Sequence, residues 1–157
     1  MSYPQYPQQQ AQPQTFQGGE PPLWAPYYGA PFPAAVKRFF KKYATFSGRA
    51  SRSEFWWWAL VSFAVSTVFN IISGATTASS LDSAPTLGIG AILGVVWGLA
   101  TLVPSLALLV RRLHDGGFSG LLALLLLVPF AGAVALLVLA ILPSKPEGQK
   151  YDQPAAG

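Results

Sequence analysis

The chain has 157 residues, of which 52% are hydrophobic and 10% charged, and its net charge is +4. The absence of cysteine excludes disulfides, cysteine-ligated metals and thiol catalysis, and so few charges are unusual for a soluble domain. Six of the ten basic residues fall between Lys37 and Arg52. A basic block beside apolar segments indicates that the partner is an anionic membrane surface. We do not expect nucleic acid as a partner.

Residues 1–33 form the first predicted segment, a disordered tail. The segment holds eight prolines and seven glutamines and few aliphatic residues. It buries too little apolar surface to offset the entropy that is lost on ordering. We predict a solvated tether, and weak self-association through its spaced aromatic residues is the alternative.

Residues 34–46 are predicted to form an amphipathic helix. Val36, Phe39, Phe40 and Tyr43 follow the spacing of one helical face, and basic residues occupy the opposite face. This pattern is typical of a helix in the membrane interface, with its cations toward lipid phosphates. The predicted lipid- and anion-binding residues are Lys37, Arg38, Lys41, Lys42, Arg49 and Arg52.

Residues 47–142 are predicted to form a bundle of about three transmembrane helices, which makes the chain an all-α membrane protein. The spans lie near 55–73, 87–110 and 118–142, and each is close to or above the ~20 residues that cross about 30 Å of hydrocarbon. Ser51 or Ser53 is suited to cap the first span, with Glu54 in its first turn. The aromatic run at 55–58 is typical of the membrane–water boundary.

Small and polar residues in the first two spans predict how these helices pack. Ser62, Ser66 and Asn70 recur on one face of the first span, and the second carries a Gly-xxx-Gly series. Polar groups in lipid need a protein partner, and glycines allow close approach of helices. We predict that the serine face packs on Gly90, Gly94 and Gly98, although membrane helices are rich in glycine for other reasons as well.

The third apolar run contains a break at Pro129 and Gly132. Either this run is one kinked crossing, or it turns back as two half-helices that do not cross. Exposed backbone at a lipid-facing break is costly, so we expect the kinked crossing. Residues 143–157 form a predicted polar tail.

The distribution of basic residues predicts the orientation. The segment before the first span is strongly basic, the loop that contains Asp82 is acidic, and the turn around Arg111 is basic again. We therefore place the N-terminus and this turn in the cytoplasm. The antiparallel spans then bring together a polar cytoplasmic cluster, in which an arginine pairs with Glu54 or Asp115. Its members are Arg49, Arg52, Glu54, Arg111, Arg112, His114 and Asp115, which could equally be plain markers of topology.

Two motifs in this chain resemble those of the bacterial "domain of unknown function 805" family of small inner-membrane proteins. The first, before the first span, comprises Gly48, Arg49, Arg52, Phe55 and Trp56. The second comprises Arg111, Arg112, His114, Asp115, Ser119 and Gly120. The resemblance covers about 39–154 and includes the Pro129–Gly132 break, but in the tail Gln149 and Asp152 replace the expected Asn and Gly. It implies an inner-membrane location and supplies no activity.

No catalytic motif is visible in the chain. His114 is the single histidine, and the sequence contains no GxSxG, Walker or HExxH pattern. We therefore expect no catalysis, no metal and no cofactor. The expected function is a membrane anchor and interaction module that contacts anionic lipid, with a homo-oligomer or a membrane protein as a further partner. An oligomeric transporter or channel is the alternative, although no ionisable residue lies deep in a span.

Overall fold

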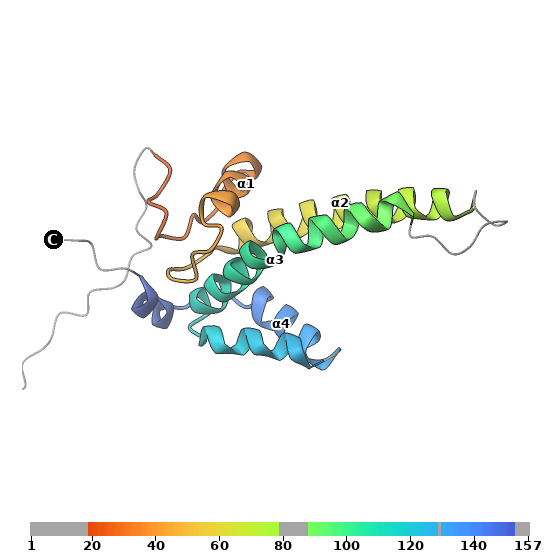
Figure 1. The fold of residues 1–157 in the computed structure, drawn as a ribbon. Coiled ribbons are helices and arrows are strands. Elements are labelled where there is room, and N and C mark those ends of the chain that lie inside the picture. Colours follow the sequence, from red (N-terminus) through yellow and green to blue (C-terminus); the bar gives the residue numbers. More distant parts are fainter. Residues whose placement is uncertain (1–18, 79–87, 129, 153–157) are drawn as a thin grey trace, which may run out of the picture.

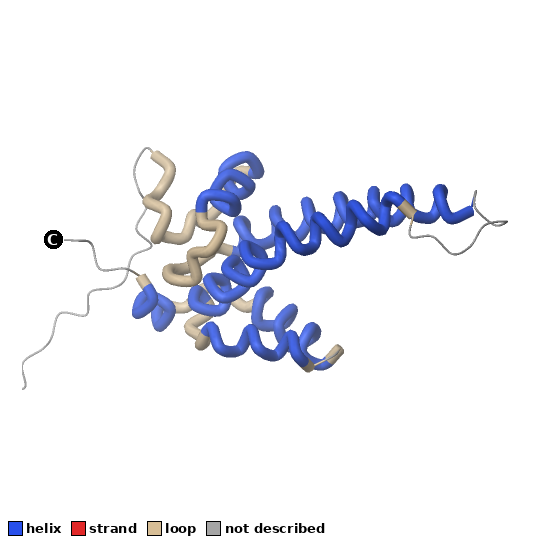
Figure 2. The backbone as a smooth tube through the Cα atoms, viewed as in Figure 1, coloured by secondary structure: helices blue, strands red, loops and turns tan. Residues whose placement is uncertain are grey.

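The computed structural model describes residues 19–78, 88–128 and 130–152, and all regular structure in these residues is helical (Figure 2). This confirms the predicted all-α class. In chain order the elements are α1 (Phe32–Lys41), α2 (Arg52–Ala78), α3 (Ile89–Asp115), the 3-10 helix η1 (Gly120–Leu127), α4 (Ala131–Ile141) and the 3-10 helix η2 (Pro146–Tyr151).

Helices α2 and α3 form a long antiparallel pair that projects beyond the rest of the fold (Figure 1). Each has 27 residues and is therefore about 40 Å long, which exceeds the hydrocarbon thickness of a bilayer. Both are long and apolar enough to cross a membrane, and most of their apolar side chains are exposed, unlike those of a core helix. They correspond to the predicted spans near 55–73 and 87–110.

Aromatic side chains fasten α1 across this helix pair. Phe39 stacks on Trp58 of α2 with 3.3 Å between ring centroids, and Trp58 stacks in turn on Trp97 of α3. With Leu108 and Ala50 these rings form the hydrophobic core. The core therefore lies at one end of the helix pair.

The third apolar run does not form a kinked crossing, which corrects our expectation. Its two halves, η1 and α4, are each about 16 Å long and pack against each other, so neither reaches across 30 Å of hydrocarbon. A Cβ on Gly132 would collide with the carbonyl of Leu125, so glycine permits the close approach of the two halves. The run thus turns back, and residues 140–152 return to the end at which α3 finishes.

The charged sequence 111–115 is the last turn of α3 and not the connecting turn that we predicted. The connection is made by Gly116 to Ser119, where Gly117 takes a φ of +81°. Arg112 and His114 lie where the negative end of the helix dipole favours positive charge. Their backbone is therefore fixed by the helix.

The predicted boundary of the disordered tail at residue 33 is also corrected. Residues 1–18 lie outside the described part of the chain, but residues 19–33 hold defined positions against α1 and α2. Pro21, Pro22 and Ala25 offer their carbonyls to Arg38, and Ala30 is buried. Hydrogen bonds to a buried cation order this segment, a contribution that its composition does not reveal.

Of the three glycines in the predicted packing face, Gly90 lies closest to α2. A Cβ on Gly90 would collide with the backbone of Phe69 and Ser73, whereas a Cβ on Gly98 would meet nothing within 4 Å. Gly94 is intermediate, at 4.0 Å from Phe69 Cβ. Ser66 and Asn70 are exposed instead of packed on α3, and the Asn70 amide donates to the Ser66 carbonyl of its own helix.

Candidate functional site: a buried polar end

Two hydrogen-bonded networks lie where α1, the start of α2 and the end of α3 meet. One surrounds the carboxylate of Glu54, and the other surrounds that of Asp115. Both carboxylates are almost completely buried, so each needs charged partners in place of water. We refer to them as the Glu54 network and the Asp115 network.

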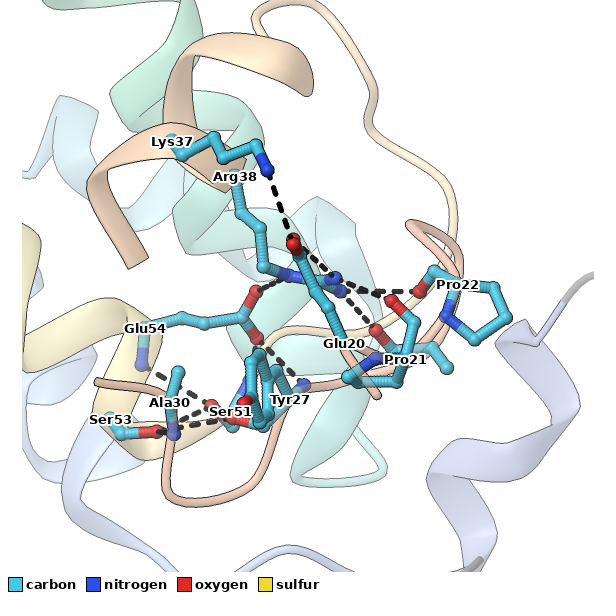
Figure 3. Close-up of polar contacts among 11 residues, drawn as sticks. Glu20, Pro21, Pro22, Tyr27, Ala30, Lys37, Arg38, Ser51, Ser53 and Glu54 are labelled. Carbon is cyan, nitrogen blue, oxygen red and sulfur yellow. Dashed lines mark hydrogen bonds and ion pairs between the residues drawn. The ribbon is translucent and has the colours of Figure 1, made fainter. Parts of the chain in front are cut away.

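The Glu54 network joins the start of α2 to α1 (Figure 3). Arg38 Nε donates to Glu54 Oε1 at 2.7 Å. The Ser51 amide donates to Glu54 Oε2 at 2.9 Å, while Ser51 Oγ accepts from the Glu54 amide at 3.2 Å. These reciprocal bonds form a capping box, which assigns the cap of α2 to Ser51. Glu54 therefore begins one helix and binds another.

The remaining donors of Arg38 bind the N-terminal segment (Figure 3). Its Nη1 donates to the Pro21 carbonyl at 2.8 Å, and its Nη2 donates to the Ala25 carbonyl at 2.5 Å. The Tyr27 amide donates to Glu54 Oε2 at 3.2 Å, so the same segment also meets the carboxylate. The guanidinium thus binds Glu54 and the carbonyls of the segment 21–25, and its Nη1 also lies 3.7 Å from Glu20 Oε1.

The Asp115 network joins α3 to three other segments. Arg112 Nη1 donates to Asp115 Oδ2 at 2.7 Å, and the Tyr28 hydroxyl donates to Oδ1 at 2.8 Å. Ser144 also donates to this carboxylate, and Arg49 Nη1 lies 3.6 Å from it. Burial and the adjacent Asp115 charge raise the pKa of Tyr28 to about 12, which keeps its hydroxyl protonated as a donor.

The chain after α4 closes over the Asp115 network. Asp152 accepts two hydrogen bonds from the guanidinium of Arg49, at 2.8 and 2.7 Å. The ring of Tyr151 stacks on His114 with 3.8 Å between centroids, and His114 Nδ1 lies 3.1 Å from the Gly48 carbonyl. Residues 151–152 thereby link both sequence motifs.

The structure brings together part of the predicted polar cluster. Arg49, Arg112 and Asp115 share one network, and His114 lies beside it. Glu54 instead pairs with Arg38, and Arg52 is exposed. The sequence predicted that buried acids pair with arginines, but four further partners were not predicted. For two of them, Tyr151 and Asp152, the resemblance of the tail to the family was the one available signal. The missed partners are Tyr28, Ser144, Tyr151 and Asp152.

The predicted lipid-binding set divides into exposed and buried residues. Lys37, Lys41 and Arg52 are exposed, which lipid contact requires. The other three are not available at the surface, which corrects that part of the prediction: they are Arg38, Lys42 and Arg49. Burial lowers the pKa of Lys42 to about 7, with Glu54 opposing this shift and the charges of Arg38 and Arg111 adding to it. The inner face of α1 therefore carries charge as well as apolar surface.

The two networks are suited to holding together the segments that meet at the polar end of the molecule. Within residues 19–78, 88–128 and 130–152, no three His, Asp or Glu side chains gather as metal ligands would. The buried carboxylates are occupied by arginines, a tyrosine, a serine and backbone amides. Their chemistry is recognition and fixation of charged groups.

The fold and this polar end define a helical membrane protein with two span-length helices and a charged head. The chain belongs to the family described as protein of unknown function (DUF805), whose model matches residues 43–153. Both polar motifs lie within that match, which confirms the resemblance seen in the sequence.

Two relatives come from Escherichia coli strain K12. Inner membrane protein YhaI is 41% identical over 99 residues, which cover 62% of this chain and 75% of the relative. Inner membrane protein YhaH is 33% identical over 101 residues, covering 64% and 78%. No solved structure matches the chain significantly. The protein is thus an inner membrane protein of a family to which no activity is assigned.

Proposed function

We propose that the protein is a non-catalytic membrane anchor whose polar end contacts anionic lipid headgroups at the cytoplasmic face. The observation that carries this proposal is the position of the exposed cations. All ten basic residues lie at the polar end, and half of them are exposed. The exposed ones are Lys37, Lys41, Arg52, Lys145 and Lys150.

Exposed aromatic residues accompany these cations. Trp56 and Trp57 follow Arg52 at the start of α2, and Phe40 lies beside Lys41 on α1. Tryptophan at the headgroup level, with lysine and arginine reaching toward phosphate, is the usual composition of a membrane boundary. Further along α2 and α3 the exposed side chains are predominantly apolar, which suits hydrocarbon.

The orientation follows from the positive-inside rule. Ten basic residues and five acids lie at the polar end, whereas the one remaining acid, Asp82, lies in the loop between α2 and α3. The hairpin of η1 and α4 returns the chain to the polar end, so both termini are proposed to be cytoplasmic. A reporter fused before Met1 or after Gly157 should be active only in the cytoplasm. Periplasmic activity after Gly157 would contradict this topology.

The lipid contact is tested with the full chain, purified in a neutral detergent and mixed with equal amounts of phosphatidylglycerol and phosphatidylcholine. The triple variant Lys37→Gln, Lys41→Gln, Arg52→Gln should bind phosphatidylglycerol up to about a hundredfold more weakly, because each surface cation contributes about 1 kcal/mol. The double variant Lys145→Gln, Lys150→Gln removes two cations of the C-terminal segment instead of three and should lose less.

Equal retention of both lipids by the unaltered chain would refute the lipid contact. Saturable flux of ions or small solutes through the reconstituted protein would favour the transporter alternative instead.

A further inference from the structure

Two buried cationic nitrogens at the polar end have no hydrogen-bond partner among the described residues: Lys42 Nζ and Arg111 Nη2. Lys42 is 2% exposed and Arg111 is 1% exposed, so water does not cover them as it covers surface cations. Arg111 Nε donates to the Ala107 carbonyl at 3.1 Å, whereas its Nη2 has no acceptor. A buried donor without an acceptor is costly and calls for an explanation.

The other buried arginines show what is missing. Arg38 binds Glu54 and three carbonyls, Arg49 binds Asp152 through two nitrogens, and Arg112 binds Asp115 and two carbonyls. Each has a carboxylate of its own. Lys42 and Arg111 have none, although they are at least as deeply buried as Arg49.

The nearest acid, Glu54, cannot serve both cations. One of its oxygens accepts from Arg38, and the other accepts from the amides of Ser51 and Tyr27. Arg38 pairs with Glu54 and also lies 3.7 Å from Glu20, so Lys42 and Arg111 are left as two buried basic groups without a carboxylate of their own. A phosphate group with a charge of about −1.5 to −2 supplies both the missing negative charge and the missing acceptors.

We propose that Lys42 and Arg111 form a binding site for a phosphate group, covered by the connection between α1 and α2. The Ala50 amide donates to the Arg111 carbonyl at 3.0 Å, which holds this connection on α3. Its residues Thr45, Phe46 and Ser47 are exposed and non-helical, so they are the part of the cover that can move without unfolding a helix. Arginine supplies a planar fork for phosphate oxygens, and lysine supplies a point charge.

This site is separate from the surface contact proposed above, because neither Lys42 nor Arg111 is exposed. The phosphate group belongs either to a free anion or to a monoester headgroup such as that of phosphatidic acid. Both sources present the same oxygens to the two nitrogens. They differ in whether an acyl chain anchors the ligand in the membrane, which the choice of probe decides.

The test uses the full chain in neutral detergent with three probes: inorganic phosphate, phosphatidic acid in mixed micelles, and phosphatidylcholine as the zwitterionic control. We expect about one bound phosphate group per chain for one or both of the first two probes. Lys42→Met and Arg111→Met should each weaken this binding at least tenfold. The exposed double variant Lys145→Gln, Glu147→Gln should change the binding of inorganic phosphate by less than twofold.

The thermal midpoint without ligand separates a binding role from a structural one. Removing an unpartnered buried charge should leave the midpoint of Lys42→Met equal to or above that of the unaltered chain. Lys42→Arg, which keeps the charge, should retain binding within a few-fold. If the protein binds inorganic phosphate, the site accepts a free anion. If it binds phosphatidic acid but not inorganic phosphate, the site accepts a lipid headgroup. Unchanged binding in Lys42→Met, equal binding of phosphatidylcholine, or no binding of either phosphate probe would overturn the proposal.

Discussion

Arg112 and Asp115, at the end of α3, are completely buried, whereas Phe63 and Leu99, along the α2–α3 pair, are 72% and 66% exposed. A water-soluble protein distributes these residue types in the opposite way. The polar end uses buried charge to hold together segments that are distant in the sequence. The extended part of the helix pair leaves its apolar side chains outward, for lipid to cover. The two regions of the chain are thus suited to two environments, the polar end to the membrane boundary and the helix pair to hydrocarbon.

Removing Asp115 should produce the largest effect, because it breaks the polar end at its centre. In Asp115→Ala the guanidinium of Arg112 remains buried without a carboxylate, and Tyr28 and Ser144 lose their acceptor. We expect a loss of about 3–5 kcal/mol in the free energy of unfolding. Denaturant unfolding in detergent measures it. The control Glu147→Ala, at an exposed position, should change the free energy of unfolding by less than about 0.5 kcal/mol. An equally small change in Asp115→Ala would show that the Asp115 network does not stabilise the fold.

An intermediate effect is expected where the helix pair is most closely packed. Gly90→Ala places a Cβ against the backbone of Phe69 and Ser73, so we expect a loss of about 1–3 kcal/mol in the same assay. Gly98→Ala is the matched control in the same helix, since its added Cβ would meet nothing within 4 Å. It should leave stability unchanged or raise it slightly, because alanine favours helix. Equal effects at both positions would mean that α2 and α3 pack with a different face.

The smallest effect, counted per pH unit, concerns the protonation of Lys42, whose pKa falls from 10.5 to about 7 on folding. Between these values the unfolded chain binds more protons, so stability should rise with pH, by at most about 1.4 kcal/mol per pH unit. Below pH 7 this contribution is flat. Glu54, Arg38 and Arg111 are the charged groups that act on Lys42. Tyr28, with its raised pKa, contributes no change below about pH 10.

The measurement is the free energy of unfolding at pH values from 7 to 9.5, without phosphate. Lys42→Met should flatten the rise, whereas Lys41→Met, at an exposed position of α1, should preserve it. A rise that persists undiminished in Lys42→Met would assign the titration to another group.

The contrast between these regions also explains which features were predictable. The long spans and the capping residues of α2 depend on neighbours in the sequence. A run of apolar residues prefers hydrocarbon whatever it packs against, and Ser51 reaches Glu54 within one helical turn. The pairing of acids with arginines was also predictable as a class, because buried carboxylates need partners. The first two spans, the start of α2 at Ser51 or Ser53 and the pairing of Asp115 with an arginine were therefore within reach of sequence reasoning, whereas the pairing of Glu54 with Arg38 was not.

The sequence by itself determined that apolar segments of membrane-crossing length lie beside a basic segment, since composition and local spacing are sufficient for both. It predicted three such spans, of which the structure has two. Only the tertiary structure decided that Arg38 and Lys42 point inward, that the run after Phe118 turns back, and that Asp152 reaches Arg49 across 103 positions of sequence. Those outcomes depend on which segments meet in space. A periodic pattern gives two faces of a helix, but the face that is buried depends on the partners present, and here the partner of a basic face is a buried carboxylate.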